Sequence, residues 1–174
     1  MVNSVLLLVC GSVAAYKVPE LVRQLKTENF IVNIALTQSA QKFVTKATLQ
    51  ALTETTVYTD QDFFDDPKAP HLSVSKRNDI LVVVPASANS IARFSCGLAD
   101  DLVSSLYMTF QGPKLIVPAM HQEMWLNEIT QKNVSNLKLN GCHFLGPTQL
   151  SIALPLTFLF FITILIAKLF KFGE

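Results

Sequence analysis

The chain has few cysteines and no excess of charge of either sign. Of its 174 residues three are cysteines, 14 are Lys or Arg and 13 are Asp or Glu. Cys10, Cys96 and Cys142 have no CxxC spacing, so neither a metal site nor a disulfide framework is predicted. No basic residue precedes the short apolar run 5–9, so no secretory signal is predicted and a reduced, cytoplasmic location is expected. The balanced charge provides no basic surface, so a nucleic-acid partner is not expected.

Apolar runs alternate with amphipathic segments along the chain. Continuous apolar runs are typical of parallel strands covered on both faces, and we expect strands at 5–10, 30–37, 79–90 with its exit turn, 114–120 and 142–147. Helices are expected within 11–29, at 39–54 with a break near Thr45, at 91–110 with an interruption at Gly97, and at 127–141. Residues 57–78 are expected to form a loop with a short helix over His71 to Arg77. The alternation predicts an α/β fold of three layers, a doubly wound parallel sheet of the flavodoxin-like or Rossmann-like kind.

The last part of the chain differs in character from the rest. We expect residues 1–149 to form one domain and 150–174 to form a hydrophobic C-terminal tail. Residues 150–167 carry no charge, and 18 residues are just enough to span a membrane. Pro155 and the polar residues of the run weaken the prediction of a membrane span, and a buried helix is the alternative. The tail is therefore interpreted as a possible membrane span, giving membrane association through 150–167, as a buried helix, or as an atypical truncated end.

Three of the predicted strands end in turns rich in small and hydroxyl residues, at 11–14, 37–40 and 85–90. Ligands of an open parallel sheet bind beyond the carboxyl ends of the strands, and N–H groups at a helix start can hold a phosphate without a lysine. Gly11 belongs to neither the GxGxxG nor the GxxxxGK[ST] motif, which favours a mononucleotide over a dinucleotide or a nucleoside triphosphate. The alternative is that these serines only cap helices.

The strand at 114–120 ends in an unusual mixture of side chains. PAMHQEMW places two methionines, a histidine and the only tryptophan, Trp125, just beyond it. We expect this stretch to form the other half of a site at the same edge of the sheet. Plain core packing is the alternative for Met120 and Met124, since methionine fills irregular gaps.

Four segments resemble the homo-oligomeric flavin-containing cysteine decarboxylases: GSVAAYK, TQSAQKF, PHLSVSKRNDILVVVPASANSIARFSCGLADDLVSS and PAMHQEMW. The resemblance runs from about Val5 to Pro147. It implies an FMN-dependent carboxy-lyase that acts on a cysteine-derived thiol acid. The HLSVSKRNDILVVVPASAN context favours the coenzyme A branch, in which 4'-phospho-N-pantothenoyl-L-cysteine becomes 4'-phosphopantetheine. The alternatives are a peptidyl-cysteine oxidative decarboxylase of the lantibiotic type, acting on a cysteine-ended peptide, and a non-catalytic FMN-binding or regulatory relative.

The resemblance also implies roles for individual residues. His71 corresponds to the active-site histidine, and His121 and Met124 are expected to contact the substrate, with His121 standing where many members have an asparagine that holds a carboxylate. Members bind FMN at subunit contacts, so a homotrimer or homododecamer is implied. The expected FMN contacts are Gly11, Ser12, Val13, Ser39, Ser87, Ala88, Asn89, Ser90 and Ala119.

The cysteines depart from the family's pattern in one respect. The reductive members carry an acid cysteine in a flap after the Gly-Pro that Gly146-Pro147 resembles, whereas no cysteine follows Cys142 in this sequence. Cys142 itself is interpreted as a strand residue. The peptide branch releases the enethiol and needs no such acid, so this departure favours that branch.

Four acidic or thiol side chains have structural interpretations. Cys10 and Cys96 are expected to be buried packing residues, as free cysteines usually are. Asp100 and Asp101 are adjacent and therefore face different ways on a helix. They are interpreted as part of a solvated helix face.

Overall fold

A computed structural model describes residues 3–65, 70–146 and 162–166, with the backbone alone for 63–65 and 70–72. Its centre is a sheet of six parallel strands in the order β3-β2-β1-β4-β5-β6. The predicted doubly wound parallel α/β fold is confirmed. The strands are β1 (Ser4–Val9), β2 (Ile31–Leu36), β3 (Val57–Tyr58), β4 (Ile80–Ala86), β5 (Lys114–Pro118) and β6 (His143–Phe144).

The two middle strands are sealed on both faces. Every residue of β1 and of β4 is buried, which explains why both strands are continuous apolar runs in the sequence. Leu7 of β1 lies level with Ile34 of β2 on one side and Val82 of β4 on the other. Because side chains alternate between the faces, this row and its neighbours form one core cluster, while Leu6 and Leu8 belong to a second cluster on the opposite face.

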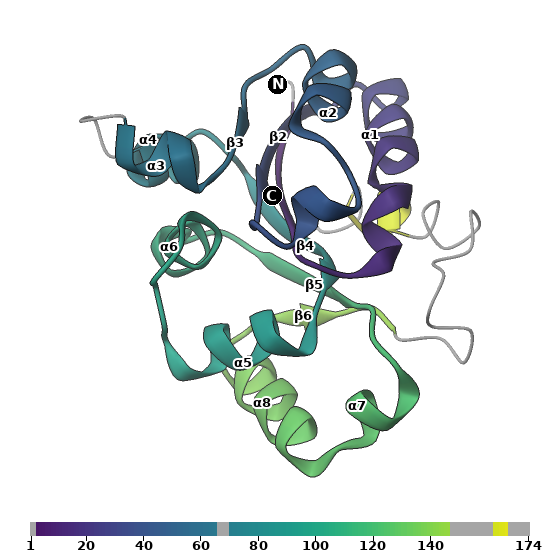
Figure 1. The fold of residues 1–174 in the computed structure, drawn as a ribbon, viewed down its shortest axis with the longest axis vertical. Helices are drawn as coiled ribbons and strands as arrows, with labels where there is room; N and C mark the ends of the chain where they lie inside the picture. Colours follow the sequence, from purple (N-terminus) through teal and green to yellow (C-terminus); the bar gives the residue numbers. More distant parts are fainter. Residues whose placement is uncertain (1–2, 66–69, 147–161, 167–174) are drawn as a thin grey trace.

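One face is covered by α1 (Val18–Thr27) and α2 (Lys46–Thr53), which follow the short 3-10 helices η1 (Val13–Lys17) and η2 (Ala40–Lys42) (Figure 1). Pro19 lies in the first turn of α1, where its missing N–H costs no hydrogen bond. Thr45 caps α2 by accepting a hydrogen bond from the backbone N–H of Thr48 at 3.1 Å. The predicted break of the 39–54 helix near Thr45 is confirmed.

The opposite face carries the remaining helices (Figure 1). Gly97 adopts φ +70 and ends α5 before α6 begins, which confirms the interruption predicted there. Gly141 also adopts a positive φ after α8, at the predicted end of that helix. The helices are α3 (Asp60–Asp65), α4 (Pro70–Lys76), α5 (Ala88–Cys96), α6 (Leu102–Thr109), α7 (Gln122–Leu126) and α8 (Glu128–Leu139).

The loop predicted over 57–78 is wrong in its first half. Val57 is fully buried and pairs with Ile34 of β2, so 57–58 form strand β3, and α3 follows directly. A strand of two residues is too short to show alternation, so the pattern carried no signal for it. The short helix predicted over His71 to Arg77 is present as α4, whereas α7 was not predicted.

A turn of helix at 162–166 packs on the face that holds α1 (Figure 1, yellow). Ile162 and Ile166 are fully buried in the same cluster as Leu21 and Val5. Within the described residues, the helices are too short or too polar to cross a membrane. Most of 150–167 and the predicted domain boundary lie outside the described residues, so membrane association and the division at 149 stay predictions.

One expectation about the cysteines is wrong. Cys10 and Cys142 are buried, but Cys96 is exposed, because Ile91 and Phe94 occupy the buried side of α5 and Cys96 is its last residue.

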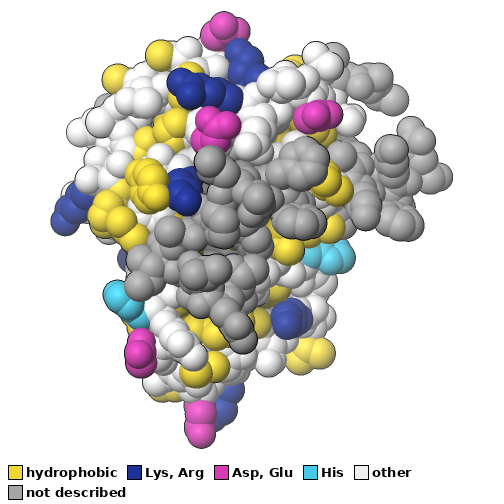
Figure 2. Space-filling model, turned by 90° about the vertical axis from the view of Figure 1, so that its right-hand side faces the viewer, with side chains coloured by type: hydrophobic (Ala, Val, Ile, Leu, Met, Phe, Trp, Pro, Cys, Tyr) yellow, Lys and Arg dark blue, Asp and Glu magenta, His cyan; other side chains and the backbone are white. Residues whose placement is uncertain are grey.

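On the face in Figure 2, Lys and Arg side chains are interspersed with Asp and Glu. This distribution agrees with the expectation of no nucleic-acid partner, which stays a prediction.

Candidate functional site

A cleft of about 670 Å³ lies beyond the carboxyl ends of β1, β2, β4 and β5. It sits where the strand order reverses between β1 and β4, the position at which open α/β sheets bind ligands. Eleven of the predicted site residues line this one cleft: Gly11, Ser12, Val13, Ser39, Ser87, Ala88, Asn89, Ser90, Ala119, His121 and Met124.

Backbone hydrogen bonds hold the four turns in register. The N–H of Thr37 donates to the carbonyl of Val9 at 3.1 Å, and the N–H of Cys10 donates to the carbonyl of Pro85 at 3.2 Å. The N–H of Ala119 donates to Ala86 at 3.0 Å. Neighbouring strands are thus tied together at the point where each one ends, so the turns that follow stand side by side.

Gly11 is required by the contact between the first two turns. A Cβ atom built on Gly11 would lie 2.4 Å from the Cβ of Ser39, far inside van der Waals contact. Ser12 accepts a hydrogen bond from the N–H of Ala14 at 3.4 Å and so caps η1. The cleft floor is therefore backbone and small side chains, which leaves room for a bulky ligand close to the chain.

The start of α5 forms the next part of the cleft. The hydroxyl oxygen of Ser87 accepts a hydrogen bond from the N–H of Ser90 at 3.2 Å and lies 3.0 Å from the Ser90 hydroxyl. Ala88 and Asn89 line the cleft in the first turn of this nine-residue helix. The positive end of the helix dipole and these polar groups together suit an anionic ligand.

Cys10 lies directly under these turns but is chemically inert. Burial raises the pKa of the Cys10 thiol to about 11, although hydrogen bonds from the Ser90 side chain and the Ser87 backbone oppose the rise. The side chain is fully buried. A neutral, inaccessible thiol is neither a nucleophile nor a metal ligand at neutral pH.

The turn after β5 contributes the last predicted residues. Ala119 and Met120 are buried, while His121 and Met124 are exposed within the cleft. His121 begins α7 and accepts a hydrogen bond from the N–H of Trp125 through its carbonyl at 3.0 Å. Core packing therefore describes Met120, which belongs to the core cluster, but not Met124, whose exposed fraction is 47%.

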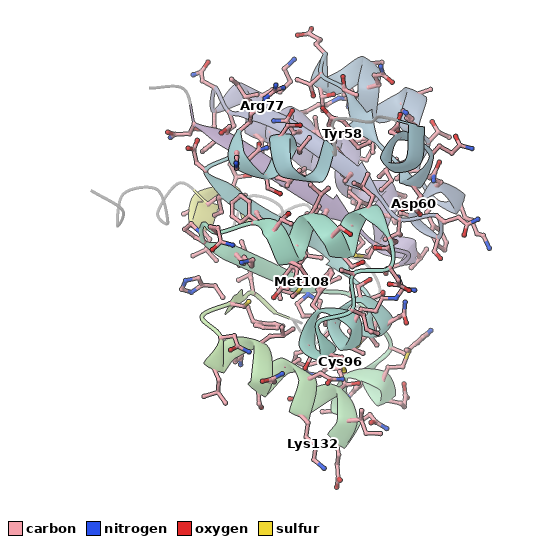
Figure 3. All side chains as sticks on the ribbon, turned by 90° about the vertical axis from the view of Figure 1, so that its left-hand side faces the viewer. Tyr58, Asp60, Arg77, Cys96, Met108 and Lys132 are labelled. Carbon is pink, nitrogen blue, oxygen red and sulfur yellow. The ribbon has the colours of Figure 1, made fainter. Side chains whose placement is uncertain are left out.

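A charged group of cleft residues was missed by the sequence analysis. The Arg93 guanidinium contacts the Asp101 carboxylate at 2.5 Å and the Asp100 carboxylate at 3.2 Å. Asp60 accepts a hydrogen bond from the N–H of Leu102 at 2.9 Å, at the start of α6 (Figure 3). We call Asp60, Arg93, Asp100 and Asp101 the acidic wall; all four line the cleft.

The interpretation of Asp101 as a solvated residue is wrong. Its side chain is 18% exposed, and its carboxylate caps α6 by accepting a hydrogen bond from the Ser104 N–H at 2.7 Å. The Asp-x-x-Ser spacing before an apolar helix was a signal for this cap. Thr37, Gln38 and Met120 line the cleft from segments that were predicted to form it, whereas Phe43 lines it without having been predicted.

The position of His71 is defined only through its helix. His71 belongs to α4, and its side chain lies outside the described residues. Helix α4 is tied to α6 by the hydroxyls of Ser75 and Thr109, which are 2.8 Å apart. These contacts test neither a catalytic role for His71 nor the distance of its side chain from the cleft.

Within the described residues, no group of His, Cys, Asp and Glu could hold a metal ion.

Comparisons with known proteins agree with this geometry. The protein CoaBC of Mycobacterium tuberculosis, a bifunctional protein of coenzyme A biosynthesis, is 42% identical over 139 residues, 80% of this chain but 33% of that protein. A probable phosphopantothenoylcysteine decarboxylase of Streptococcus mutans is 38% identical over 150 residues, 84% of each chain. The solved structure of a PPC decarboxylase mutant complexed with pantothenoylaminoethenethiol is 31% identical with a TM-score of 0.78, covering 85% of this chain and 84% of that one.

A comparison with a family model covers nearly the whole sequence. The chain spans about a third of the bifunctional relatives and most of the shorter one. The model of one family, described as flavoprotein, matches residues 2–157. The resemblance found in the sequence is confirmed at this level: the chain belongs to the flavoprotein family.

Proposed function

We propose that the chain binds FMN in the cleft and decarboxylates a cysteine-derived thiol acid, with 4'-phospho-N-pantothenoyl-L-cysteine as the substrate and 4'-phosphopantetheine as the product. The observation that carries the proposal is the convergence of four strand-end turns on a single cleft, which nine residues expected to contact FMN and two expected to contact the substrate line together. The similarity to the Streptococcus mutans protein supports the choice of substrate.

The residues of the cleft fit FMN. The space above Gly11 exists only because that residue has no Cβ, and the start of α5 offers N–H groups and serine hydroxyls to one phosphate. In the proposal Ser12, Ser39 and Ser87 hold the phosphate side of the cofactor. Ala119, whose small side chain lies at the end of β5, stands near the ring.

The chemistry requires an oxidation before the decarboxylation. A cysteinyl carboxylate has no electron sink beside the carbanion that loss of CO2 would create. Bound FMN supplies the hydride acceptor that converts the thiol to a thioaldehyde, and the thiocarbonyl is then that sink. His71 is proposed to take or orient the thiol proton, since imidazole exchanges protons near neutral pH.

The substrate carboxylate is assigned to the turn after β5. His121 is exposed in the cleft, and an imidazole N–H can donate to a carboxylate as an amide N–H does. Met124 provides an apolar side for the chain of the substrate. His121 is the N-cap of α7 and Met124 lies in the first turn of that helix, and both residues line the cleft.

The end point of the reaction depends on a proton donor. Cys10 and Cys142 are buried, and Cys96 does not line the cleft. The described residues are therefore proposed to carry the oxidative half, which ends at the enethiol. Return of the hydride and a proton needs an acid other than these three thiols at the cleft.

A homotrimer or homododecamer completes the proposal. Val13, Phe43 and Met124 line the cleft and are each exposed by close to half, at 46%, 45% and 47%. Apolar side chains at the mouth of a cleft are suited to burial against another subunit. FMN bound there would lie between subunits.

The test is a single turnover without air. The FMN-loaded chain is mixed with 4'-phospho-N-pantothenoyl-L-cysteine, and in parallel with a cysteine-ended peptide, and the flavin absorbance, CO2 and product mass are followed. Bleaching and CO2 with the first compound support the proposal, and the product mass separates enethiol from 4'-phosphopantetheine. Turnover of the peptide alone would replace the proposed substrate.

Variants of the histidines test the assigned roles. His71→Asn is expected to slow bleaching by about 100-fold or more, a usual contribution of acid–base catalysis. His143→Asn is the matched control, because His143 is exposed on β6 and does not line the cleft. Equal bleaching rates in His71→Asn and the wild type would remove His71 from the mechanism.

A further inference from the structure

One part of the cleft is uncharged, and another part carries a net negative charge. The turns after β1, β2 and β4 present glycine, serine and alanine without formal charge. The acidic wall, made of Asp60, Arg93, Asp100 and Asp101, has three carboxylates and one guanidinium and therefore a formal charge of −2.

The acidic wall is rigidly built. Both terminal nitrogens of Arg93 are engaged, one by Asp101 and one by Asp100. Asp101 is fixed by the Ser104 N–H at 2.7 Å, and Asp60 by the Leu102 N–H at 2.9 Å. Because all these bonds converge on the start of α6, the charges keep their positions relative to the cleft.

Partial burial makes these charges effective. The Asp101 and Arg93 side chains are 18% and 30% exposed, so water and salt screen them less than they screen a surface pair. Asp100 is 58% exposed and is screened more. The charges of Arg93 and Asp101 largely cancel, so the net negative field in the cleft comes mainly from Asp60 and Asp100.

The field orients an anionic ligand. A phosphate dianion is repelled by the acidic wall and attracted by the start of α5, where Ser87 and Ser90 offer polar groups. The guanidinium of Arg93 is held by two carboxylates and so is not a free phosphate ligand.

We propose, on the basis of the proposed function, that the acidic wall lowers the reduction potential of the flavin bound in this cleft. Hydride transfer from the carbon that bears the thiol moves two electrons and one proton to the ring. The thiol proton leaves to a base, and the C=S bond forms. The ring thereby gains one negative charge, which a wall of charge −2 opposes.

The test compares the affinities of oxidised and reduced FMN, measured without air and without substrate. Asp60→Asn keeps the oxygen that accepts the Leu102 N–H and removes one charge. Asp100→Asn removes a charge at a more exposed position. Each change is expected to improve the affinity for reduced FMN relative to oxidised FMN, by about tenfold for Asp60→Asn and about threefold for Asp100→Asn. A tenfold change in this ratio is a shift of about 30 mV for a two-electron couple.

Two variants of Arg93 test the direction in which charge shifts the ratio of the two FMN affinities. Arg93→Gln makes the wall more negative and should shift the ratio in the opposite direction, whereas Arg93→Lys keeps the charge and should leave the ratio near that of the wild type. Glu20→Gln is the matched control, since Glu20 pairs with Arg23 on α1 and does not line the cleft. It changes the net charge by the same amount and should leave the ratio unchanged.

The outcomes separate this inference from the proposed function. If the wild type does not bind FMN, the proposed function is overturned and the inference with it. If FMN binds but Asp60→Asn and Asp100→Asn give the same ratio as Glu20→Gln, the acidic wall does not act on the flavin. In that case the inference alone is overturned.

Discussion

Both edges of the sheet carry polar and ionisable side chains, but these side chains differ in their access to solvent. At the carboxyl edge, serines, a histidine and a guanidinium line an open cleft. At the amino edge, the Tyr107 hydroxyl lies 3.0 Å from the Cys142 sulfur, and the Lys114 ammonium donates to the Phe110 carbonyl at 2.6 Å. Tyr107 and Cys142 are buried, Tyr107 is stacked on Phe94 with the ring centroids 4.0 Å apart, and Lys114 is half-buried.

Burial and access, rather than residue type, separate the two edges. Burial raises the pKa of Tyr107 well above its usual range and lowers the pKa of Lys114. Both groups are engaged by protein partners, so the amino edge is suited to stability. The carboxyl edge keeps polar groups turned toward solvent-filled space, where a ligand can replace water.

The largest expected effect is at the narrowest point of the carboxyl edge. Gly11→Ala would place a methyl group 2.4 Å from Ser39 and push the first two turns apart. We expect FMN affinity to fall by more than about 100-fold and the free energy of unfolding to fall by about 1 to 3 kcal/mol. Flavin fluorescence titration and urea denaturation measure the two quantities.

Gly141→Ala is the control for this change. Gly141 has a positive φ, and nothing lies within 4 Å of an added Cβ. It should lose about 1 kcal/mol of stability from backbone strain and keep its FMN affinity. A Gly11→Ala chain that binds FMN as Gly141→Ala does would show that the contact between the turns is not part of the site.

Cys10 links the cleft floor to the stability of the fold at high pH. A thiol whose pKa is raised from 9.0 to about 11 in the folded state stabilises the fold below pH 9 and loses that contribution as the pH rises through 11. The loss is about 2 to 3 kcal/mol for a shift of this size. The other titrating groups are shared with a Cys10→Ala variant.

The comparison of Cys10→Ala with the wild type therefore isolates the thiol. Urea denaturation at pH 8 and again near pH 11 should show a smaller loss of stability in Cys10→Ala than in the wild type. Parallel losses in the two chains would mean that the thiol is not protected by the fold.

The amino edge should affect stability alone. Cys142→Ala removes the partner of the buried Tyr107 hydroxyl, which should lower the free energy of unfolding by about 1 to 3 kcal/mol. FMN affinity should be unchanged, since neither residue lines the cleft. A loss of FMN affinity at constant stability would contradict the division between the two edges.

The smallest effects come from two helix caps with the same chemistry. Ser87 caps α5 at the cleft, and Thr45 caps α2 outside it. Ser87→Ala and Thr45→Ala should each lower the free energy of unfolding by about 1 kcal/mol. Only Ser87→Ala should weaken FMN binding, by about fivefold to tenfold, as expected for one hydrogen bond to a charged group. Equal FMN affinities would assign Ser87 to capping alone.

The sequence predicted those parts of the molecule that depend on local patterns. Apolar runs located β1, β2, β4 and β5, and Thr45 and Gly97 marked the breaks in two helices. The turns that form the cleft were predicted to meet because parallel strands end at one edge of the sheet. The individual cleft residues were implied by the resemblance to the flavin-containing cysteine decarboxylases.

The parts that were missed depend on contacts between distant segments. The hydrogen bond from Leu102 to Asp60 joins residues 42 positions apart, and no local pattern announces it. Strand β3 is defined by its pairing with β2 rather than by alternation in two residues. Arg93 and Asp101 were each visible in the sequence, but their pairing across the turn at Gly97 follows from the fold.

The most direct measurement of the central claim is the affinity of the purified wild-type chain for FMN and for riboflavin, which lacks the phosphate. The account predicts that FMN binds about 100-fold more tightly or better, because the start of α5 and the serine turns hold the phosphate. It predicts that Ser87→Ala narrows this difference. Equal affinities for FMN and riboflavin, or no binding of either, would contradict it.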